Sequence, residues 1–252
     1  MEFSRQSYNL LHSLAAGGPR TEDPDDPVTV QAMQIVLHLP KQDPPLRSEL
    51  LAVAAQAVAA VCLDPRAATD PAWRQALHGW YSHRIRKVSR RARNKGWRDV
   101  QKLPGITAVA ENNPDAQARA FLPGPVNMVP PALRRLQIAG TDLPPDPTPP
   151  LLSPMGKHEL LVGVDASLAM TLGKAAAQVG HAAMLWAARK PADVVGRWVS
   201  ANMPIRAVEL SHEQFQHLAN DPDTIVVHDA GFTEVAPGSV TALATDTLNI
   251  RD

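Results

Sequence analysis

The two halves of the chain show the same succession of apolar runs, and this repetition constrains the fold most strongly. Five pairs of segments correspond in the same order: 33–39 with 158–164, 54–61 with 176–184, 84–88 with 204–208, 106–111 with 224–229, and 123–126 with 237–240. Self-similarity of this kind is typical of repeated structural units. The sequence therefore predicts an internal duplication, against the alternative that two α/β units share a helix-rich composition by coincidence.

The second half predicts its elements most clearly. Residues 160–164 (LLVGV) form a short apolar run suited to a buried strand, and from Thr171 the apolar residues recur at helical spacing. Four further elements are expected: strands at 205–210, 224–228 and 239–244, and a helix that opens at Ser211 with the pattern of a capping box. This alternation predicts an α/β fold.

Prolines divide the chain. Residues 143–154 hold six prolines, which favour extended geometry and indicate a semi-rigid spacer. The first residues end in a polar stretch with acids and prolines, which predicts a mobile tail. The expected organisation is a flexible tail over 1–27, one unit over 28–140, a linker over 141–156 and a second unit over 157–252.

The net charge hides an asymmetry. The chain has 25 Lys and Arg against 25 Asp and Glu, yet residues 1–150 carry a net charge of +4 and residues 151–252 carry −4. The longest apolar runs fall short of the roughly 18 residues that cross a membrane. The single cysteine, Cys62, permits no internal disulfide, which fits a reducing cytoplasm.

Two segments carry residues suited to chemistry. In the first, residues 229–241 (DAGFTEVAPGSVT), a carboxylate ends a strand and two turns return the chain to another strand, where Ser239 and Thr241 share a face. Asp229 and the two hydroxyls can therefore meet at one sheet edge. The alternative is that Asp229 caps a turn and the hydroxyls bond to the backbone.

The second segment is a polar line on the expected helix. Lys174, Gln178 and His181 lie at positions i, i+4 and i+7, on the face opposite the apolar stripe. A lysine in the first turn opposes the helix dipole, which suggests an anionic partner such as a phosphate or a developing oxyanion. The alternative is a solvated lysine on a surface turn.

At these segments the sequence resembles the type II peptidyl-tRNA hydrolase family. The matching motifs are GKAAAQVGHA at 173–182 and DAGFTEVAPGSVT at 229–241, and the resemblance covers about 157–246. It implies a four-stranded mixed sheet with helices on both faces. With the repeat, this predicts two small α/β/α units with four-stranded mixed sheets, arranged as a tandem pseudo-dimer.

The resemblance also implies hydrolysis, without a metal or other cofactor, of the ester between a peptidyl group and the terminal ribose of tRNA. Its catalytic residues fall on Lys174, Asp229 and Thr241. An ester hydrolase needs an activated water and a stabilised oxyanion, roles that Asp229 and Lys174 can fill while Thr241 holds the water or the ribose. Four residues are expected to position the substrate: Gln178, His181, Thr233 and Ser239.

The catalytic half departs from the family pattern where cations are expected. Ala169, Leu172 and Phe232 replace two lysines and an arginine, which leaves the mode of tRNA binding open. Under the repeat, the counterparts of Lys174, His181, Asp229 and Thr241 in the first half are Ala52, Ala59, Glu111 and Asn127. The first copy is therefore expected to lack catalysis.

The first half holds a dense run of cations of the kind that the catalytic half lacks. Residues 83–102 hold nine Lys and Arg with one acid, and they predict a basic helix that contacts phosphates, with an aromatic ring to stack on a base. The expected tRNA-binding residues are Arg84, Arg86, Lys87, Arg90, Arg91, Arg93, Lys95, Trp97 and Arg98. The alternative is a solvated basic face.

These observations favour a peptidyl-tRNA hydrolase with a degenerate N-terminal copy that binds tRNA. Two alternatives stay open: a non-catalytic tRNA- or ribosome-binding protein, and a hydrolase of another acylated carrier. No metal site is expected, because His212 and His217 are five residues apart rather than the four of a zinc-protease helix. A monomeric pseudo-dimer without a membrane partner is expected, with a homodimer as an open alternative.

Overall fold

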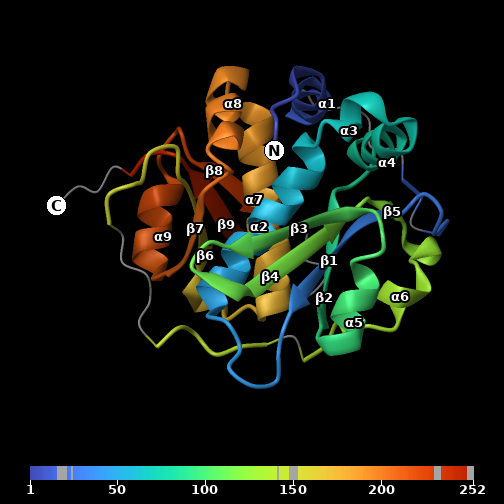
Figure 1. Cartoon of the computed structure of the whole chain (residues 1–252). Coiled ribbons are helices and arrows are strands. Elements are labelled where there is room, and N and C mark those ends of the chain that lie inside the picture. Colours follow the sequence, from blue (N-terminus) through green and yellow to red (C-terminus); the bar gives the residue numbers. More distant parts are fainter. Residues whose placement is uncertain (16–21, 24, 141, 148–152, 230–233, 249–252) are drawn as a thin grey trace.

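The computed structural model describes residues 1–15, 22–23, 25–140, 142–147, 153–229 and 234–248. It contains two sheets with two long helices between them (Figure 1). The first sheet has the strands β1 Gln31–His38, β2 Arg86–Ala92, β3 Gly105–Ala110, β4 Asn113–Phe121 and β5 Gly124–Pro125. Its main path runs β2-β1-β4-β3; β1 and β2 are parallel, the other pairs are antiparallel, and the short β5 pairs with the start of β1.

The second sheet has the same order and the same strand directions. Its strands are β6 Leu160–Asp165, β7 Ile205–Leu210, β8 Ile225–His228 and β9 Val240–Thr245. They run in the order β7-β6-β9-β8, with β6 and β7 parallel and the other pairs antiparallel. The prediction of two α/β units with mixed sheets is confirmed.

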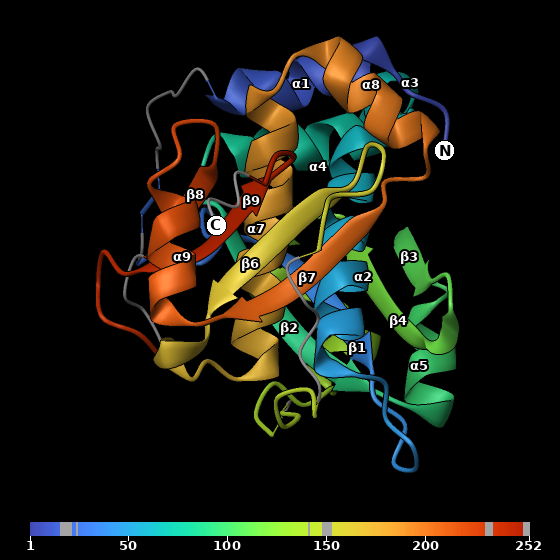
Figure 2. The same cartoon turned by 90° about the vertical axis from the view of Figure 1, so that its left-hand side faces the viewer.

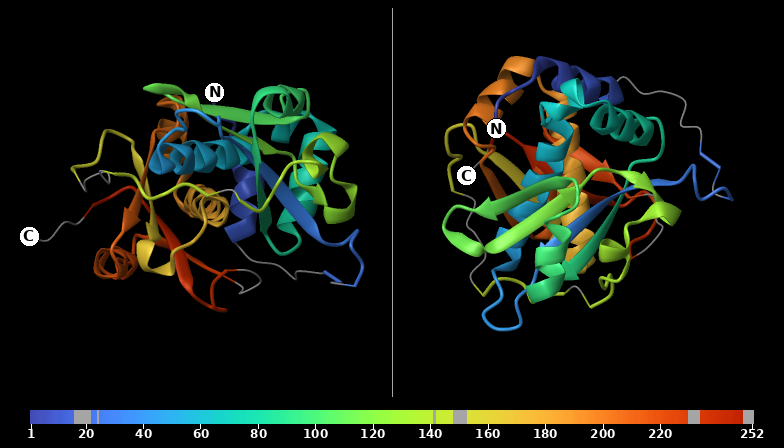
Figure 3. Two further views of the ribbon diagram at one scale, coloured as in Figure 1. Left: turned by 90° about the horizontal axis from the view of Figure 1, so that it is seen from below. Right: turned by 45° about the vertical axis from the view of Figure 1, so that its right-hand side comes forward.

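Helices α2 (Arg47–Leu63) and α7 (Leu172–Arg189) fill the space between the sheets (Figure 3). Helix α2 packs on β3 and β4 and reaches β7, whereas α7 packs on β6, β8 and β9 and reaches β2. A helix covered on all sides must be apolar all round, and thirteen of the seventeen residues of α2 are buried. The two units therefore share one continuous hydrophobic core.

Shorter helices cover the outer surfaces and the ends of the sheets (Figures 1 and 2). They are α3 Arg66–Thr69, α4 Pro71–Tyr81, α5 Asn94–Val100, α6 Pro131–Arg134, α8 Ala192–Ser200 and α9 His212–Ala219, with 3-10 turns η1 Val126–Met128 and η2 Ala166–Leu168. The helix expected to open at Ser211 does so with the predicted capping box.

The prediction of a flexible tail over 1–27 is wrong for its first part. Helix α1 spans Arg5–Ala15, and its Tyr8 and Leu11 are buried against the core. The hydroxyl of Ser7 donates to the carbonyl of Asp64 at 2.8 Å, and that of Tyr8 donates to the carbonyl of Lys190 at 2.9 Å. These contacts tie the helix to both units, which a composition-based argument could not anticipate.

One pairing of the predicted repeat is also wrong. Residues 123–126 follow β4, whereas residues 237–240 lead into β9. Because β4 and β9 occupy the same place in their sheets, the two segments lie at opposite ends of corresponding strands. Asn127 is therefore not the counterpart of Thr241.

The stretch Arg47–Thr69, which includes α2, is long and apolar enough to pass a membrane-span test based on length and composition. Of its most apolar window, 78% is buried within the structure. This is the behaviour of a core helix, and it explains the apolar composition without a lipid environment.

Candidate active site

Helix α7 begins at a point that places Lys174 in its first turn, as predicted. The hydroxyl of Thr171 caps the helix by accepting a hydrogen bond from the backbone N–H of Lys174 at 3.3 Å. This satisfies one of the N–H groups that every helix start leaves unpaired. Gln178 lies one turn further along on the same face, so both side chains project toward the end of β8.

Asp229 follows β8 directly and is fixed by its own backbone. Its N–H donates to the carbonyl of Ser239 at 2.9 Å, and its carbonyl accepts from the N–H of Gly238 at 2.8 Å. Gly238 has a φ of +81°, which glycine adopts without steric cost. The chain therefore returns on itself here, and Asp229 is held, buried, at the strand end.

Lys174, Gln178 and Asp229 meet in one cluster. The ammonium group of Lys174 pairs with Oδ2 of Asp229, and Nε2 of Gln178 donates to the same oxygen at 2.6 Å. The side chains of Lys174 and Asp229 are 12% and 7% exposed, so little water screens their attraction. The carboxylate also offsets the cost of a cation at the positive end of a helix. The anionic partner expected for Lys174 is, in this structure, Asp229.

The other expected catalytic and positioning residues lie around this cluster. Thr241 in β9 is fully buried, and its hydroxyl donates to the carbonyl of Val227 at 3.4 Å. Ser239 and His181 are half-buried, Ser239 beside Asp229 in the backbone pairing and His181 one turn after Gln178. Thr233 and Phe232 lie outside the described residues.

Sequence reasoning missed Glu234. Its carboxylate accepts hydrogen bonds from the backbone N–H of Thr171 at 2.9 Å and from the hydroxyl of Thr171 at 2.7 Å. Glu234 therefore joins the segment that follows Asp229 to the N-cap residue of the helix that carries Lys174. It stands at a variable position of the motif, so the sequence offered no signal for it.

Asp165 begins the turn that leads into α7. Its buried carboxylate accepts from the backbone N–H of Ser167 at 2.9 Å and lies 2.7 Å from Nδ1 of His212. Burial alone would raise the pKa of Asp165, but the hydrogen bonds of Ser167 and His212 together hold the pKa below its usual range.

The prediction of a basic helix over 83–102 is wrong, because Arg86–Ala92 forms the edge strand β2 and only Asn94–Val100 forms a helix. Successive side chains of a strand point to opposite faces, so a dense run of cations must place some of them inward. Four of the expected tRNA-binding residues are exposed: Arg84, Arg93, Lys95 and Arg98. Two others are half-buried and engaged, Arg86 with Glu22 and Arg91 with Gln137.

Two of the expected tRNA-binding residues, Arg90 and Trp97, are buried, and a third, Lys87, is half-buried with its amine inside the protein, so none of the three is placed to contact tRNA at the surface. Arg90 donates to Gln34 and to the carbonyl of Leu136. The amine of Lys87 lies 5.0 Å from the centre of the Trp80 ring, and burial lowers its pKa to about 7. Trp97 is 9% exposed and packs in a small core, so its ring is covered and cannot stack on a base.

Among the described residues, no group of three or more His, Cys, Asp or Glu side chains is arranged to hold a metal ion. What the cluster offers chemically is a carboxylate, an ammonium group and an amide within hydrogen-bond distance of one another. A carboxylate can orient or deprotonate a water molecule, and an ammonium group can stabilise a negative oxygen.

Comparison with protein families matches residues 158–249 to the family described as peptidyl-tRNA hydrolase PTH2. The matched region runs from the start of β6 past the end of β9, and it contains Lys174, Gln178 and Asp229. No curated protein matches the chain significantly.

Proposed function

Since residues 158–249 match the peptidyl-tRNA hydrolase PTH2 family, we propose that this chain hydrolyses the ester between a peptidyl group and the terminal ribose of tRNA. The observation that carries the proposal is the buried cluster of Lys174, Gln178 and Asp229 inside the matched region. It combines the groups that ester hydrolysis requires, a base for water and a cation for the oxyanion.

In the proposed reaction, Asp229 orients the attacking water and takes its proton. The Gln178 amide keeps the carboxylate in place through its 2.6 Å hydrogen bond. Once Asp229 is protonated it no longer attracts the ammonium group of Lys174. Lys174 is then available to the oxyanion that forms as the water oxygen bonds to the ester carbonyl carbon. When this intermediate collapses, the bond from that carbon to the ribose oxygen breaks and Asp229 returns its proton to the ribose oxygen, which releases tRNA and the free peptidyl acid.

The hydroxyl of Thr241 has a supporting role in this proposal. Because it is fully buried and bonded to the carbonyl of Val227, it holds the end of β8 from which Asp229 projects. His181 and Ser239, which are half-buried beside the cluster, are the residues we assign to substrate contacts, together with Thr233.

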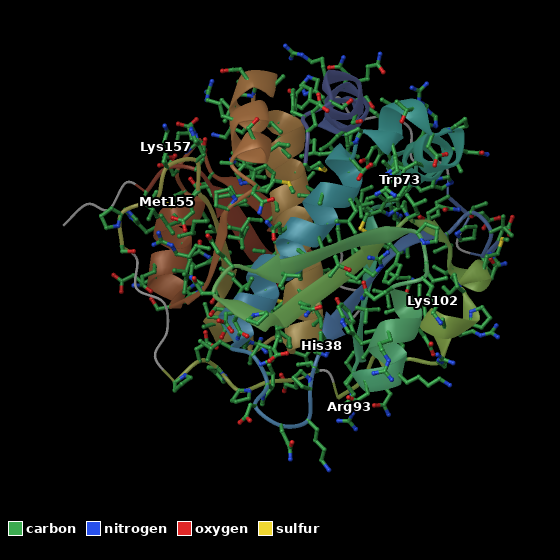
Figure 4. All side chains as sticks on the ribbon, viewed as in Figure 1. His38, Trp73, Arg93, Lys102, Met155 and Lys157 are labelled. Atoms are coloured by element: carbon green, nitrogen blue, oxygen red, sulfur yellow. The ribbon has the colours of Figure 1, made fainter. Side chains whose placement is uncertain are left out.

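We assign tRNA binding to the exposed cations Arg93, Lys95 and Arg98. They lie on α5 and the residue before it, at the lower end of the molecule, which is also the end where α7 begins (Figures 1 and 4). Each contact with a phosphate releases counterions and adds salt-dependent affinity. These residues supply positive charge that Ala169 and Leu172 do not provide in the catalytic half.

The first test is release of a labelled N-acylated amino acid from tRNA by wild type and by Asp229→Asn. We expect the variant to lose at least about 100-fold in kcat, since a positioned base contributes on that order, with tRNA affinity unchanged. Asp223→Asn is the matched control, because Asp223 is an exposed acid of the same unit, and it should keep full activity.

The same assay separates the alternatives. A wild-type protein that binds tRNA but releases no label would be a non-catalytic binding protein. Hydrolysis of a small acylated carrier that bare tRNA does not inhibit would indicate a different substrate. Equal activity of wild type and Asp229→Asn would reject the proposed mechanism.

The second test replaces Arg93, Lys95 and Arg98 together by Ala. We expect weaker tRNA binding, with the slope of log affinity against log salt reduced by about three, since each lost phosphate contact removes about one. The matched control removes three exposed cations elsewhere, Arg5, Lys157 and Arg189. An equal loss of affinity in both triple variants would mean that binding follows net charge and not this surface.

A further inference from the structure

Arg47 is the first residue of α2, and its side chain is only 4% exposed. A cation in this place is disfavoured twice, by removal from water and by the positive end of the helix dipole. Such a residue is retained where its partners compensate for both costs. The hydrogen-bond and ion-pair partners of Arg47 therefore indicate its role in the structure.

The hydrogen-bond and ion-pair partners of the Arg47 side chain lie outside its own unit. Nε pairs with Oε1 of Glu209 at the end of β7, at 2.9 Å, and Nη2 donates to the carbonyl of Met170 at 2.6 Å. Nη1 donates to the carbonyl of Leu143 at 3.1 Å and lies 3.4 Å from a carboxylate oxygen of Asp142. The planar fork of a guanidinium group suits this divergent set, which a lysine could not satisfy.

The contact with Met170 fixes one peptide group from both sides. The carbonyl of the peptide between Met170 and Thr171 accepts from Arg47, while the N–H of the same peptide donates to Glu234 at 2.9 Å. Thr171 then caps α7 and accepts from the N–H of Lys174. The orientation of this peptide group therefore sets where the first turn of α7, with Lys174, lies relative to Asp229.

The turn before this peptide group contains an unfavourable conformation. Ala169 has φ 46° and ψ 38°, a left-handed geometry that the Cβ of alanine disfavours. Residues of this kind persist where surrounding contacts over-determine them, and they cluster at functional sites. Here Asp165 holds the start of the turn through Ser167, and Arg47 holds its end through Met170.

We propose that Arg47, from the N-terminal unit, is a positioning residue for the cluster of Lys174 and Asp229 in the C-terminal unit. It acts through the Ala166–Thr171 turn, and the inference rests on the proposed hydrolase function. The N-terminal unit then contributes to hydrolysis by positioning the catalytic cluster, in addition to any role in tRNA binding.

The test compares Arg47→Met with Gln56→Met. Gln56 lies on the same helix and also bonds across to the second unit, donating from Nε2 to the carbonyls of Asn202 at 2.8 Å and Met203 at 3.2 Å, but it does not touch the turn. We expect Arg47→Met to lower kcat by about 10- to 100-fold, as small misplacements of catalytic groups do, with KM and tRNA affinity within about twofold. Gln56→Met should leave kcat unchanged.

A second readout does not depend on activity. Amide hydrogen exchange at residues 171–176 should become faster in Arg47→Met and stay unchanged in Gln56→Met. Arg47→Lys, which keeps the charge and loses the fork, should give an intermediate kcat. If Arg47→Met does not fold because Glu209 is left without its partner, Arg47→Met/Glu209→Gln removes both charges and serves in its place.

The outcomes separate the two proposals. Unchanged kcat and unchanged exchange in the Arg47 variants would overturn the inference, as would equal losses in the Arg47 and Gln56 variants. If the wild type releases no label, the proposed function fails, and the exchange measurement alone decides whether Arg47 holds the turn.

Discussion

Two lysines of this chain have amines that are shielded from water, and their surroundings differ. Lys174 is largely buried beside the carboxylate of Asp229, which stabilises its charge. The amine of Lys87 is fully buried, makes no hydrogen bond with the described residues, and lies over the ring of Trp80. Burial lowers the pKa of Lys87 to about 7, although the nearby Cys62 acts in the opposite direction. At the residue scale, the two buried amines therefore differ in whether a carboxylate lies beside them.

We expect Lys87→Met to stabilise the protein, by several kcal/mol as an order of magnitude near pH 7, since each pKa unit corresponds to about 1.4 kcal/mol. The unfolded chain holds the proton until the pH approaches 10.5, the ordinary pKa of a lysine, whereas the folded chain releases it near 7. Wild-type stability contributed by this group therefore rises with pH across that window.

The gain from Lys87→Met should accordingly be largest at pH 7 or below and should shrink toward pH 10. Urea unfolding of both proteins across this range measures it. Lys157→Met, at an exposed lysine, is the control and should show no such trend. A gain that is the same at pH 7 and pH 10 would show that Lys87 is not the titrating group.

At the element scale, the first turn of α7 is joined to the loop after β8. Two helices of the second unit, α7 and α9, begin with the same device, in which a hydroxyl accepts from the N–H three residues on at 3.3 Å. In α7, however, the capping Thr171 also binds Glu234, so the cap sets the geometry of the cluster as well as the helix boundary.

Substitution of each cap residue by alanine should separate the role in starting the helix from the role in placing Lys174. Thr171→Ala and Ser211→Ala should each lower the free energy of unfolding by about 1 kcal/mol, the usual cost of losing an N-cap. Only Thr171→Ala should also lower kcat, by about tenfold or more, because it loosens the placement of Lys174. Unfolding and hydrolysis are measured on the same preparations, and a matching loss of kcat in Ser211→Ala would refute the distinction.

At the scale of the whole molecule, α2 and α7 are the central elements of both units. Arg47 lies beside Met170 and Val58 lies beside Gly180, so the two helices run in the same direction between the sheets. At Gly180 the approach is so close that a Cβ would lie 2.8 Å from Cγ2 of Val58. The absence of a side chain there allows the two units to share a core.

Gly180→Ala should therefore destabilise the whole chain. We expect a loss of about 1 to 3 kcal/mol in the free energy of unfolding, the usual cost of overpacking, in spite of the higher helix propensity of alanine. Adding Val58→Ala removes the clashing methyl group, so the double variant should lose less than the sum of the two single variants. Strict additivity in this double-mutant cycle would argue against direct contact.

The sequence by itself determined the local elements of this protein. Strand and helix periodicity, the capping box at Ser211 and the helix start after Thr171 depend on residues close along the chain, and each prediction is confirmed. The line of Lys174 and Gln178 follows from helix geometry alone, and both side chains reach Asp229. The identity of their partner required the resemblance as well, because helical spacing does not say what faces the helix.

Only the tertiary structure decided which basic side chains are exposed at the surface and which are buried. The basic stretch looked like one surface, yet on β2 the amine of Lys87 and the side chain of Arg90 are buried, whereas Arg93, Lys95 and Arg98, which follow the strand, are exposed. Three sets of contacts join residues far apart in sequence. They are the contacts of the helix Arg5–Ala15, the hydrogen bonds between Glu234 and Thr171, and the hydrogen bond from Arg47 to Met170 in the second unit. No local pattern records such contacts, because burial and pairing depend on which parts of the chain the folded structure brings near one another.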